Sequence, residues 1–454
     1  MKKIGMILFL AAFLLLALIP SLGMLVFGPA EAAANEILAF PPSVTGEDGS
    51  FNKSVLHDAS DYLADHFFLR QQLVTADAKL EAGLLGESAA EDVVLGKEGW
   101  LYYAATLDDY RSQNLMTKRQ IWAAARTLKL IQDYAAENGA RMLFVIVPNK
   151  NEIYPEYMPG WALAGAEPDN REELNQALAF AGVDYLDLTP VLTAEKPTAQ
   201  LYQTQDSHWN NLGAALAHDA ILSGLGREGS AYDPAAFISR RDHVGDLYTM
   251  LYPTGTEKDL QYYPARDWQF QYTKKIRSPQ DQTILTACES AEGSLLMFRD
   301  SFGNTLHSFM AESFAEASFS RAMPYNLQLL AGRNPDTLVI ELVQRNLPWL
   351  AQRAPILPAP IRALDLSDAK AAAEISLTPG EEGSLFRLSG ELPLDPEEDS
   401  PVWIEADGVL YEASPVGETQ RSFTAYLPEP ASLIRVCFRS GGTLYAAPCR
   451  IEIP

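Results

Sequence analysis

Two short polar stretches of this 454-residue chain hold side chains suited to acid–base and nucleophilic chemistry. The first, TQDSHWNN (204–211), places Asp206 two residues before His208, one of only six histidines. In a turn, a carboxylate at this spacing can reach the imidazole Nδ1, which leaves Nε2 free to take a proton from a nucleophile. The alternative is a solvated turn that happens to hold a histidine.

The second stretch, LLMFRDSFGNTL (295–306), contains the candidate nucleophile Ser301. An apolar run precedes Ser301 and a helical pattern follows it, a junction that resembles a nucleophile elbow. The hydroxyl would then lie at the carboxyl edge of the sheet, beside helix amides that can stabilise an oxyanion. The alternative is that Ser301, or Asp300 beside it, only caps the helix.

Further polar or aromatic residues are weaker candidates for oxyanion or substrate binding: Asn149, Lys150, Arg299, Asn304 and Trp209. Each has a structural alternative. The first two could lie in a solvated loop, the arginine could form a salt bridge, Asn304 could cap the helix, and Trp209 could pack in the core. Tyr202 is also a choice between sugar stacking and core packing, and Glu341 with Arg345 suggests a structural ion pair. His243 has no partner identifiable from the sequence, and no H-E-x-x-H motif or Cys/His cluster predicts a metal.

The elements that must position these residues alternate between helices and buried strands. Residues 117–138 predict an amphipathic helix that Thr117 caps and Asn138-Gly139 ends. The apolar run 140–150 that follows predicts a central parallel strand. Residues 170–192 repeat this helix–strand scheme, 210–226 predict another helix, 293–314 a strand followed by a helix, and 335–347 one more strand. A hairpin is predicted over 93–103, and residues 51–85 have helical spacing. We therefore predict an α/β domain over 51–355, with helices on both faces of the sheet.

The pattern changes near residue 365, after the Pro-rich joint 353–363. Short alternating strands with turns at Asp407-Gly408 and Gly441-Gly442 predict a small β-sandwich over 365–454. Cys437 and Cys449 could bridge in an oxidising compartment, and Cys288 is expected to be a buried hydrophobe.

The N-terminus predicts export. Lys2 and Lys3 precede an uncharged run from 4 to 28, long enough for a membrane anchor over 1–30 with the body outside the cytoplasm. A cleaved signal peptide is the alternative, because GPAEAAA (28–34) offers cleavage sites. Residues 31–50 read as a linker, and the net charge of −24 argues against nucleic acid as a partner.

The ordered combination of DSHWN (206–210) and RDSFGN (299–304) resembles the DHHW proteins and the alginate O-acetyltransferase proteins AlgJ and AlgX, whose shared domain looks like an SGNH hydrolase. Four other stretches fall in the same order over roughly residues 50 to 355: LGKEGWLYY (95–103), VIVPNKNEIYPEYMP (145–159), GDL (245–247) and PDTLVIELVQRNL (335–347). One departure is Ser207, where the family often has histidine; we expect its side chain to point away from the Asp206–His208 axis.

The resemblance implies an SGNH hydrolase-like, mainly parallel sheet, with Asp206 orienting His208, His208 as base and Ser301 as nucleophile. It also implies a cofactor-independent serine O-acyltransferase, acting outside the cytoplasm on a cell-surface or secreted polysaccharide. A membrane-bound O-acyltransferase would then supply the acyl group. A carbohydrate acetylesterase and a non-catalytic polysaccharide-binding scaffold are the alternatives.

Overall fold

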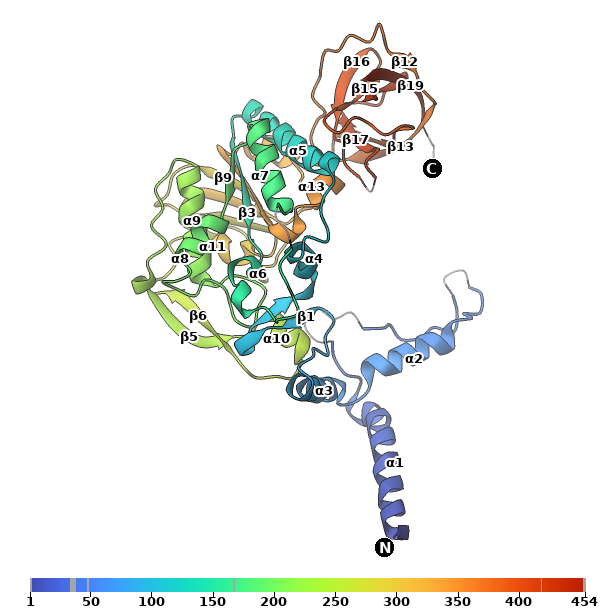
Figure 1. Cartoon of the computed structure of the whole chain (residues 1–454), viewed down its shortest axis with the longest axis vertical. Helices are drawn as coiled ribbons and strands as arrows, with labels where there is room; N and C mark the ends of the chain where they lie inside the picture. Colours follow the sequence, from blue (N-terminus) through green and yellow to red (C-terminus); the bar gives the residue numbers. More distant parts are fainter. Residues whose placement is uncertain (1, 33–37, 47–48, 166–167, 418, 452–454) are drawn as a thin grey trace.

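The core of the α/β part is a seven-stranded sheet in the order β4-β3-β11-β9-β10-β8-β7, of which Figure 1 labels β3 and β9. The computed structural model describes residues 2–32, 38–46, 49–165, 168–417 and 419–451. The strands from β4 to β10 in this order are parallel, whereas β8 and β7 form an antiparallel edge. The strands are β3 (Arg141–Val147), β4 (Tyr185–Asp187), β7 (Gln271–Tyr272), β8 (Thr283–Ala287), β9 (Ser294–Phe298), β10 (Glu316–Ser320) and β11 (Thr337–Val343).

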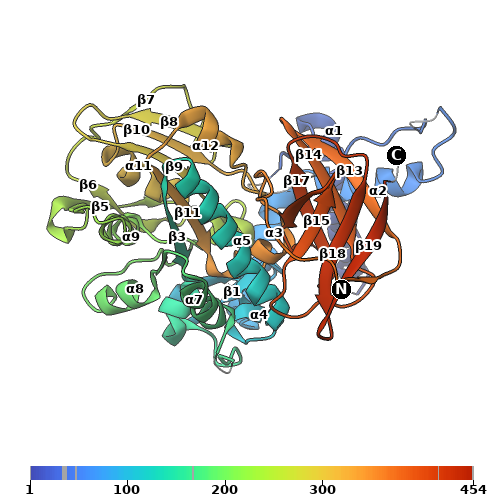
Figure 2. The same ribbon diagram turned by 90° about the horizontal axis from the view of Figure 1, so that it is seen from above.

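The sheet is covered on both faces because its strands are apolar on both sides. Phe144 of β3 belongs to the cluster formed with α5 (Lys118–Glu137) and α7 (Asn170–Ala181). Its neighbour Val145 belongs to the cluster on the other face, formed with α8 (Thr189–Glu195), α9 (Asn211–Gly224) and α11 (Gly303–Glu312). Figure 2 shows α5 and α9 on opposite sides of β3 and β11. The predicted mainly parallel α/β sheet with flanking helices is confirmed.

Local signals in the sequence set the ends of several elements. Thr117 caps α5 in a capping box with Gln120, as predicted. The expected hairpin over 93–103 is present as β1 (Val93–Leu95) paired with β2 (Leu101–Tyr103). A second antiparallel pair, β5 (Phe237–His243) with β6 (Asp259–Pro264), was not predicted, because β5 is mostly exposed and carries no apolar alternation.

The described residues of the α/β part also form five short helices. They are α4 (Leu107–Tyr110), α6 (Lys150–Ile153), α10 (Asp246–Leu251), α12 (Gln328–Arg333) and α13 (Trp349–Gln352). Two of them, α6 and α10, lie beside the polar loop that holds His208, and their role is described below.

The C-terminal part is β-rich, as expected, but it is one curled sheet. Its order is β16-β15-β18-β19-β13-β14-β17, with β12 beside β19, and a bridge between Ser414 and Thr424 joins its two ends. The strands are β12 (Lys370–Ala371), β13 (Ile375–Glu382), β14 (Leu385–Glu391), β15 (Val402–Ala406), β16 (Val409–Ala413), β17 (Ser422–Leu427), β18 (Ile434–Ser440) and β19 (Thr443–Ile451). The predicted hairpin turns at 407–408 and 441–442 are present, each with two residues at positive φ.

All three cysteines are free, so a bridge between Cys437 and Cys449 is not formed. The register explains this, because Cys437 of β18 pairs with Ala446 of β19, and Cys449 lies farther along that strand. Cys288 is buried, as expected.

Ion pairs to one buried carboxylate help to join the curled sheet to α5, the helix that packs on the seven-stranded sheet. Glu412 of β16 has a side chain only 1% exposed, and it binds Arg126 and Arg362 at 2.6 and 2.7 Å. Arg119 of α5 donates to the carbonyl oxygens of Glu397 and Ser400. This contact fixes the two sheets side by side.

The N-terminal part consists of α1 (Lys2–Phe27), α2 (Val55–His66) and α3 (Arg70–Leu84). The helical pattern expected over 51–85 is thus two helices, separated where Leu69 takes a positive φ of 63°. Among the described residues, no helix combines the length and the apolar character that a membrane span requires, so the predicted anchor is not confirmed. Parts of the expected linker, 33–37 and 47–48, lie outside the described residues. The bounds of the four predicted segments stay predictions.

Glu412→Ala should destabilise the protein by about 3 kcal/mol, because it leaves two guanidinium groups without their buried carboxylate. Chemical or thermal unfolding of the full chain measures this. Glu405→Ala is the matched control: Glu405 lies on the adjacent strand, and its partner Arg435 is 45% exposed, so about 1 kcal/mol or less is expected. Equal effects of the two substitutions would contradict the importance of the buried contact.

Candidate active site

The loop that holds Asp206 and His208 is closed at its base by the bridge between Tyr202 and Trp209. The N–H of Asn210 donates to the Leu201 carbonyl oxygen, and the Asn210 side chain caps α9, which begins at the next residue as expected. Gly213 in the first turn of α9 allows this close approach, since a Cβ there would lie 2.4 Å from the Leu201 oxygen. The loop is therefore anchored against a helix of the core.

Ser301 lies between β9 and α11, at the carboxyl edge of the parallel strands. Asp300 fixes this junction: one carboxylate oxygen accepts from the Phe302 N–H at 2.9 Å, and the other accepts from the Val343 N–H of β11 at 2.8 Å. A Cβ at Gly303 would lie 2.6 Å from the Arg299 Cβ, so the start of α11 requires glycine. The Ser301 side chain does not cap α11.

The fold brings the two stretches together. His208 Nε2 lies 2.8 Å from Ser301 Oγ, and His208 Nδ1 lies 2.7 Å from Asp206 Oδ1. These distances are those of a nucleophile hydrogen-bonded to a base that a carboxylate orients. The His208 ring also packs against Phe302, with 4.8 Å between the ring centroids.

Asp206 is buried and accepts four hydrogen bonds. Oδ1 accepts from the backbone N–H and Nδ1 of His208, and Oδ2 accepts from His243 Nε2 at 2.9 Å and the Asp246 N–H at 3.1 Å. Burial alone would raise the pKa of Asp206, but its hydrogen bonds and the charges of both histidines hold that pKa well below its usual value. Asp206 is therefore ionised at neutral pH.

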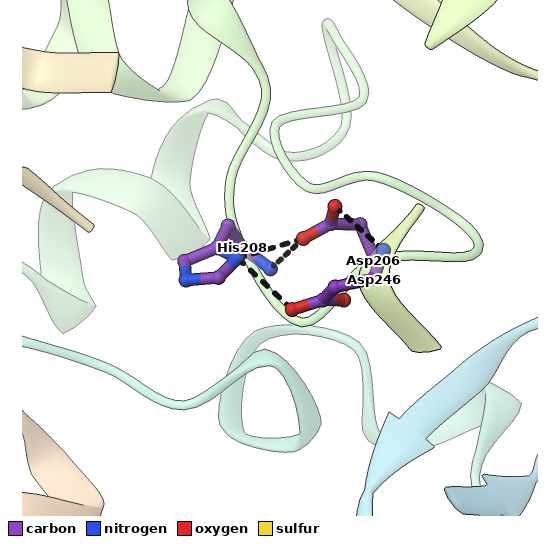
Figure 3. A group of neighbouring side chains, drawn as sticks. All are labelled: Asp206, His208 and Asp246. Atoms are coloured by element: carbon purple, nitrogen blue, oxygen red, sulfur yellow. Dashed lines mark hydrogen bonds and ion pairs between the residues drawn. The ribbon is translucent and has the colours of Figure 1, made fainter. Parts of the chain in front are cut away.

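A second carboxylate, Asp246 of α10, lies on the same side of the His208 ring (Figure 3). Its Oδ2 is 3.4 Å from His208 Nδ1 and accepts from the Ser207 hydroxyl at 2.6 Å. Burial favours the neutral imidazole, but the two carboxylates outweigh it and raise the pKa of His208 above its usual value. The expectation that Ser207 points away was wrong: its Oγ lies 3.1 Å from His208 Nδ1 and links it to Asp246.

Asp206, His208 and Asp246 offer ligand atoms within 4.8 Å of one another, close enough to share a metal ion. However, both Asp206 oxygens accept N–H groups, and both Asp246 oxygens accept donors from Ser207. The hydrogen-bond donors around the carboxylates therefore suit proton transfer better than metal binding.

Lys150 does not line the mouth of the site but is buried behind it. Its Nζ donates to the carbonyl oxygens of Leu101, Thr204 and Asp206 at 2.7 to 2.9 Å, and it lies over the Trp100 ring. Burial lowers the pKa of Lys150 to about 7, against the opposing effect of nearby carboxylates. Lys150 thus fastens the Asp206 loop to β2.

A cavity of about 400 Å³ opens beside Ser301. Its lining combines four arginines with two acidic residues, Asp300 and Glu341, so basic groups are in excess. The arginines are Arg299, Arg321, Arg345 and Arg353, and the aromatic residues of the lining are Tyr103, Tyr325 and Trp349. Within the part of the chain that the structure describes, Arg321, Arg345 and Arg353 form no ion pair with a carboxylate. Arg345 instead lies over the rings of Tyr103 and Phe302. The cavity is therefore suited to an anionic ligand.

The predicted ion pair between Glu341 and Arg345 was wrong. Glu341 accepts from the Asp300 N–H at 3.1 Å, and its side chain is fully buried. Burial and the neighbouring Asp300 raise the pKa of Glu341 well above its usual value. The protonated, neutral form of Glu341 is therefore favoured, which weakens its effect on the charge of the cavity arginines.

The other candidates have mainly structural contacts. Arg299 is buried and donates to Asn304 Oδ1 at 2.6 Å and to two backbone oxygens, although it also lines the cavity. Asn149 is buried and donates to Asp109. Trp209 is 1% exposed and donates to the Phe302 carbonyl oxygen, so it packs in the core and does not reach a ligand, as is also true of Tyr202.

A second Ser–His–Asp chain of hydrogen bonds lies elsewhere in the domain. His218 Nε2 is 2.7 Å from Ser313 Oγ, and His218 Nδ1 is 2.8 Å from Asp219. Ser313 lies at the carboxyl end of α11, and none of these three residues lines the cavity beside Ser301. These hydrogen bonds link α9 to the end of α11, and the three residues provide a control for substitutions at the Ser301 site.

Residues 93–296 match the family model described as "SGNH hydrolase-like domain, acetyltransferase AlgX". The chain is 27% identical over 219 residues to a "Probable alginate O-acetylase AlgJ" of Pseudomonas syringae pv. tomato, covering 46% of this chain and 54% of the relative. The AlgJ of Pseudomonas aeruginosa, described in the same words, is 25% identical over 241 residues, covering 52% and 59%.

Residues 93–296 are thus similar to the SGNH hydrolase-like domain of AlgX, and about half of the chain is similar to AlgJ proteins. The resemblance that the short motifs indicated is thereby confirmed. The chain spans just over half the length of these two curated relatives, and the family match ends before Ser301. Among solved structures, the "O-Acetyltransferase Domain of Pseudomonas putida AlgJ" is similar at a TM-score of 0.36 and 18% identity, covering 56% of this chain and 92% of that one.

His208 should titrate above 6.5, the usual histidine value, and Asp206→Asn should lower its midpoint. The folded state favours the imidazolium, so His208 loses its proton, and becomes available as a base, at a higher pH than an ordinary histidine. The substitution removes the negative charge that holds it. NMR titration of ¹³C-labelled histidine, assigned with His208→Gln, measures both midpoints. A wild-type midpoint at or below 6.5 would contradict the geometry.

Proposed function

We propose that the chain is a serine O-acyltransferase that moves an acetyl group onto a polysaccharide, with Ser301 as nucleophile, His208 as base and Asp206 as its orienting carboxylate. The observation that supports this most directly is the 2.8 Å contact between His208 Nε2 and Ser301 Oγ beside an open cavity. The names of the AlgJ relatives agree with O-acetylation.

The proposed reaction has two halves. His208 removes the Ser301 proton, Oγ bonds to the acetyl carbonyl carbon, and the donor's ester C–O bond breaks as His208 protonates the leaving alcohol. His208 then takes a proton from a sugar hydroxyl, whose oxygen attacks the acetyl-serine, and Ser301 leaves with its proton restored. The product is an ester on the sugar. Water in place of the sugar would make the chain an esterase.

The cavity favours an acidic polysaccharide as acceptor. Three arginines without carboxylate partners in the described residues lie within one cavity of a chain whose net charge is −24. Guanidinium groups bind carboxylates through paired hydrogen bonds, and the aromatic lining suits sugar rings. Alginate, which the names of the AlgJ relatives carry, is such an acidic polymer.

We also propose where the protein acts and what supplies its acetyl group. The charged and apolar pattern of residues 1–30 supports a body outside the cytoplasm, held by an anchor or released after signal cleavage. A membrane-bound O-acyltransferase would then deliver the acetyl group. The curled C-terminal sheet is proposed as a surface for the polymer or for another protein.

A sulfonyl fluoride that reacts with activated serines should label Ser301, and Ser301→Ala should lower acetyl-ester hydrolysis roughly 10³-fold or more. Mass spectrometry locates the label, and a chromogenic acetyl ester reports turnover. Ser313→Ala is the matched control, because Ser313 has an equivalent pair of partners, His218 and Asp219, but does not line the cavity.

The same assay separates the alternatives. An acetyl donor offered with acidic oligosaccharide should yield acetylated sugar, whereas a plain esterase would yield only free acetate with or without the oligosaccharide. A non-catalytic scaffold would bind the oligosaccharide, take no label and leave the donor intact in both serine variants.

Arg345→Gln should lower kcat/KM for transfer to an acidic oligosaccharide about tenfold more than for transfer to its neutral, carboxyl-reduced counterpart. The reason is that Arg345 lies over the Phe302 ring, next to Ser301, and lines the cavity without an ion pair to a carboxylate of the described residues. Arg333→Gln, an exposed arginine on α12, is the control. An equal loss for both acceptors would rule out charge recognition by Arg345.

A further inference from the structure

His243 contacts the carboxylate that orients His208, although nothing in the chemistry proposed above uses it. Its Nε2 lies 2.9 Å from Asp206 Oδ2, whereas His208 contacts the other oxygen of the same carboxylate, Oδ1. A carboxylate oxygen can only accept, so Nε2 of His243 carries the proton of this bond. Asp206 therefore lies between two imidazoles.

The backbone around His243 is built to make this contact. His243 is the last residue of β5, and a register shift between Arg241 and His243 changes the direction of its side chain. Two residues later, a Cβ at Gly245 would lie 2.0 Å from the Gln205 carbonyl oxygen, so only glycine fits. The Asp246 N–H then reaches the same Asp206 oxygen at 3.1 Å.

The charges around His243 come from each neighbouring element. Asp206 is in the loop, Asp246 is on α10, and Asp259 is the partner of His243 in the β5–β6 pair. Lys150 of α6 binds the backbone oxygen of Asp206. Burial lowers the pKa of His243, but the hydrogen bond to Asp206 and the three carboxylates raise it overall.

We propose that His243 is a positioning residue that fixes Asp206 and limits how strongly Asp206 holds a proton on His208. This role rests on the proposed function, in which His208 is the base. A donor on Oδ2 draws negative charge away from Oδ1, which faces His208. It also prevents the carboxylate from rotating, because the two oxygens are held by donors from different segments.

Removal of His243 should change the charge on the Asp206 oxygen that faces His208. Without His243, more of the Asp206 charge faces His208, so the imidazolium is favoured and the base is available only at higher pH. His243→Ala should raise the His208 midpoint by about one pH unit, which is a tenfold shift of its protonation equilibrium. The acid limb of kcat/KM should move by the same amount, and ester hydrolysis at pH 7 should fall about tenfold.

His243→Gln is the conservative variant, since its amide can donate to Asp206 Oδ2 without carrying a charge. It should recover at least about half of the shift and of the lost activity. His218→Gln is the matched control, because His218 has its own aspartate in α9 and should leave the His208 midpoint unchanged. Thermal unfolding of each variant identifies any loss of fold.

The decisive measurement is NMR titration of His208 in the full-length chain with labelled histidines, alongside the pH profile of ester hydrolysis. A folded His243→Ala protein whose His208 midpoint does not move, or Ala and Gln variants with the same shift, would overturn the role of His243. If wild type hydrolyses and transfers no ester, the proposed function fails. The titration still decides whether His243 controls the pKa of His208.

Discussion

The site depends on a buried carboxylate that must be given enough donors. Asp206 is 6% exposed, and an ionised carboxylate in such a place is stable only when its oxygens are hydrogen-bonded. Four donors from three segments meet this requirement: the loop itself, the end of β5 and the start of α10. Because His208 is one of those donors, the interactions that keep Asp206 ionised also orient the His208 ring toward Ser301.

The buried position of Asp206 also requires that the backbone of its loop be hydrogen-bonded. The loop carries backbone carbonyl groups into the interior, and Lys150 binds two of them, those of Thr204 and Asp206, together with that of Leu101. Its ammonium group lies over aromatic rings, an arrangement that stabilises a buried cation. The hairpin of β1 and β2, far from the chemistry in sequence, is therefore part of what holds the loop.

The sequence predicted what apolar periodicity and local caps encode: the helix–strand alternation, the capping of α5 by Thr117 and the helix that starts after Asn210. It also suggested that Asp206, His208 and Ser301 would meet. It missed His243 and Asp246, because their contacts bridge about forty residues and β5 has no buried face to mark it. Whether a polar residue such as Lys150 at a strand end turns inward depends on remote carbonyl groups, which no local pattern encodes. The curled form of the C-terminal sheet likewise depends on pairing between its end strands.

Two Ser–His–Asp hydrogen-bond series of nearly equal geometry occur in the described part of the protein, so these three residue types alone do not define an active site. At Ser313 the series ends at the carboxyl end of a helix, and the carboxylate also binds the backbone of residues 231 and 232. At Ser301 it ends at the amino end of a helix, and a cavity with arginines adjoins the serine. An oxyanion is favoured at Ser301 and disfavoured at Ser313, because a helix presents N–H groups at its amino end and carbonyl oxygens at its carboxyl end. The direction of α11 therefore distinguishes the candidate nucleophile from a structural hydrogen bond.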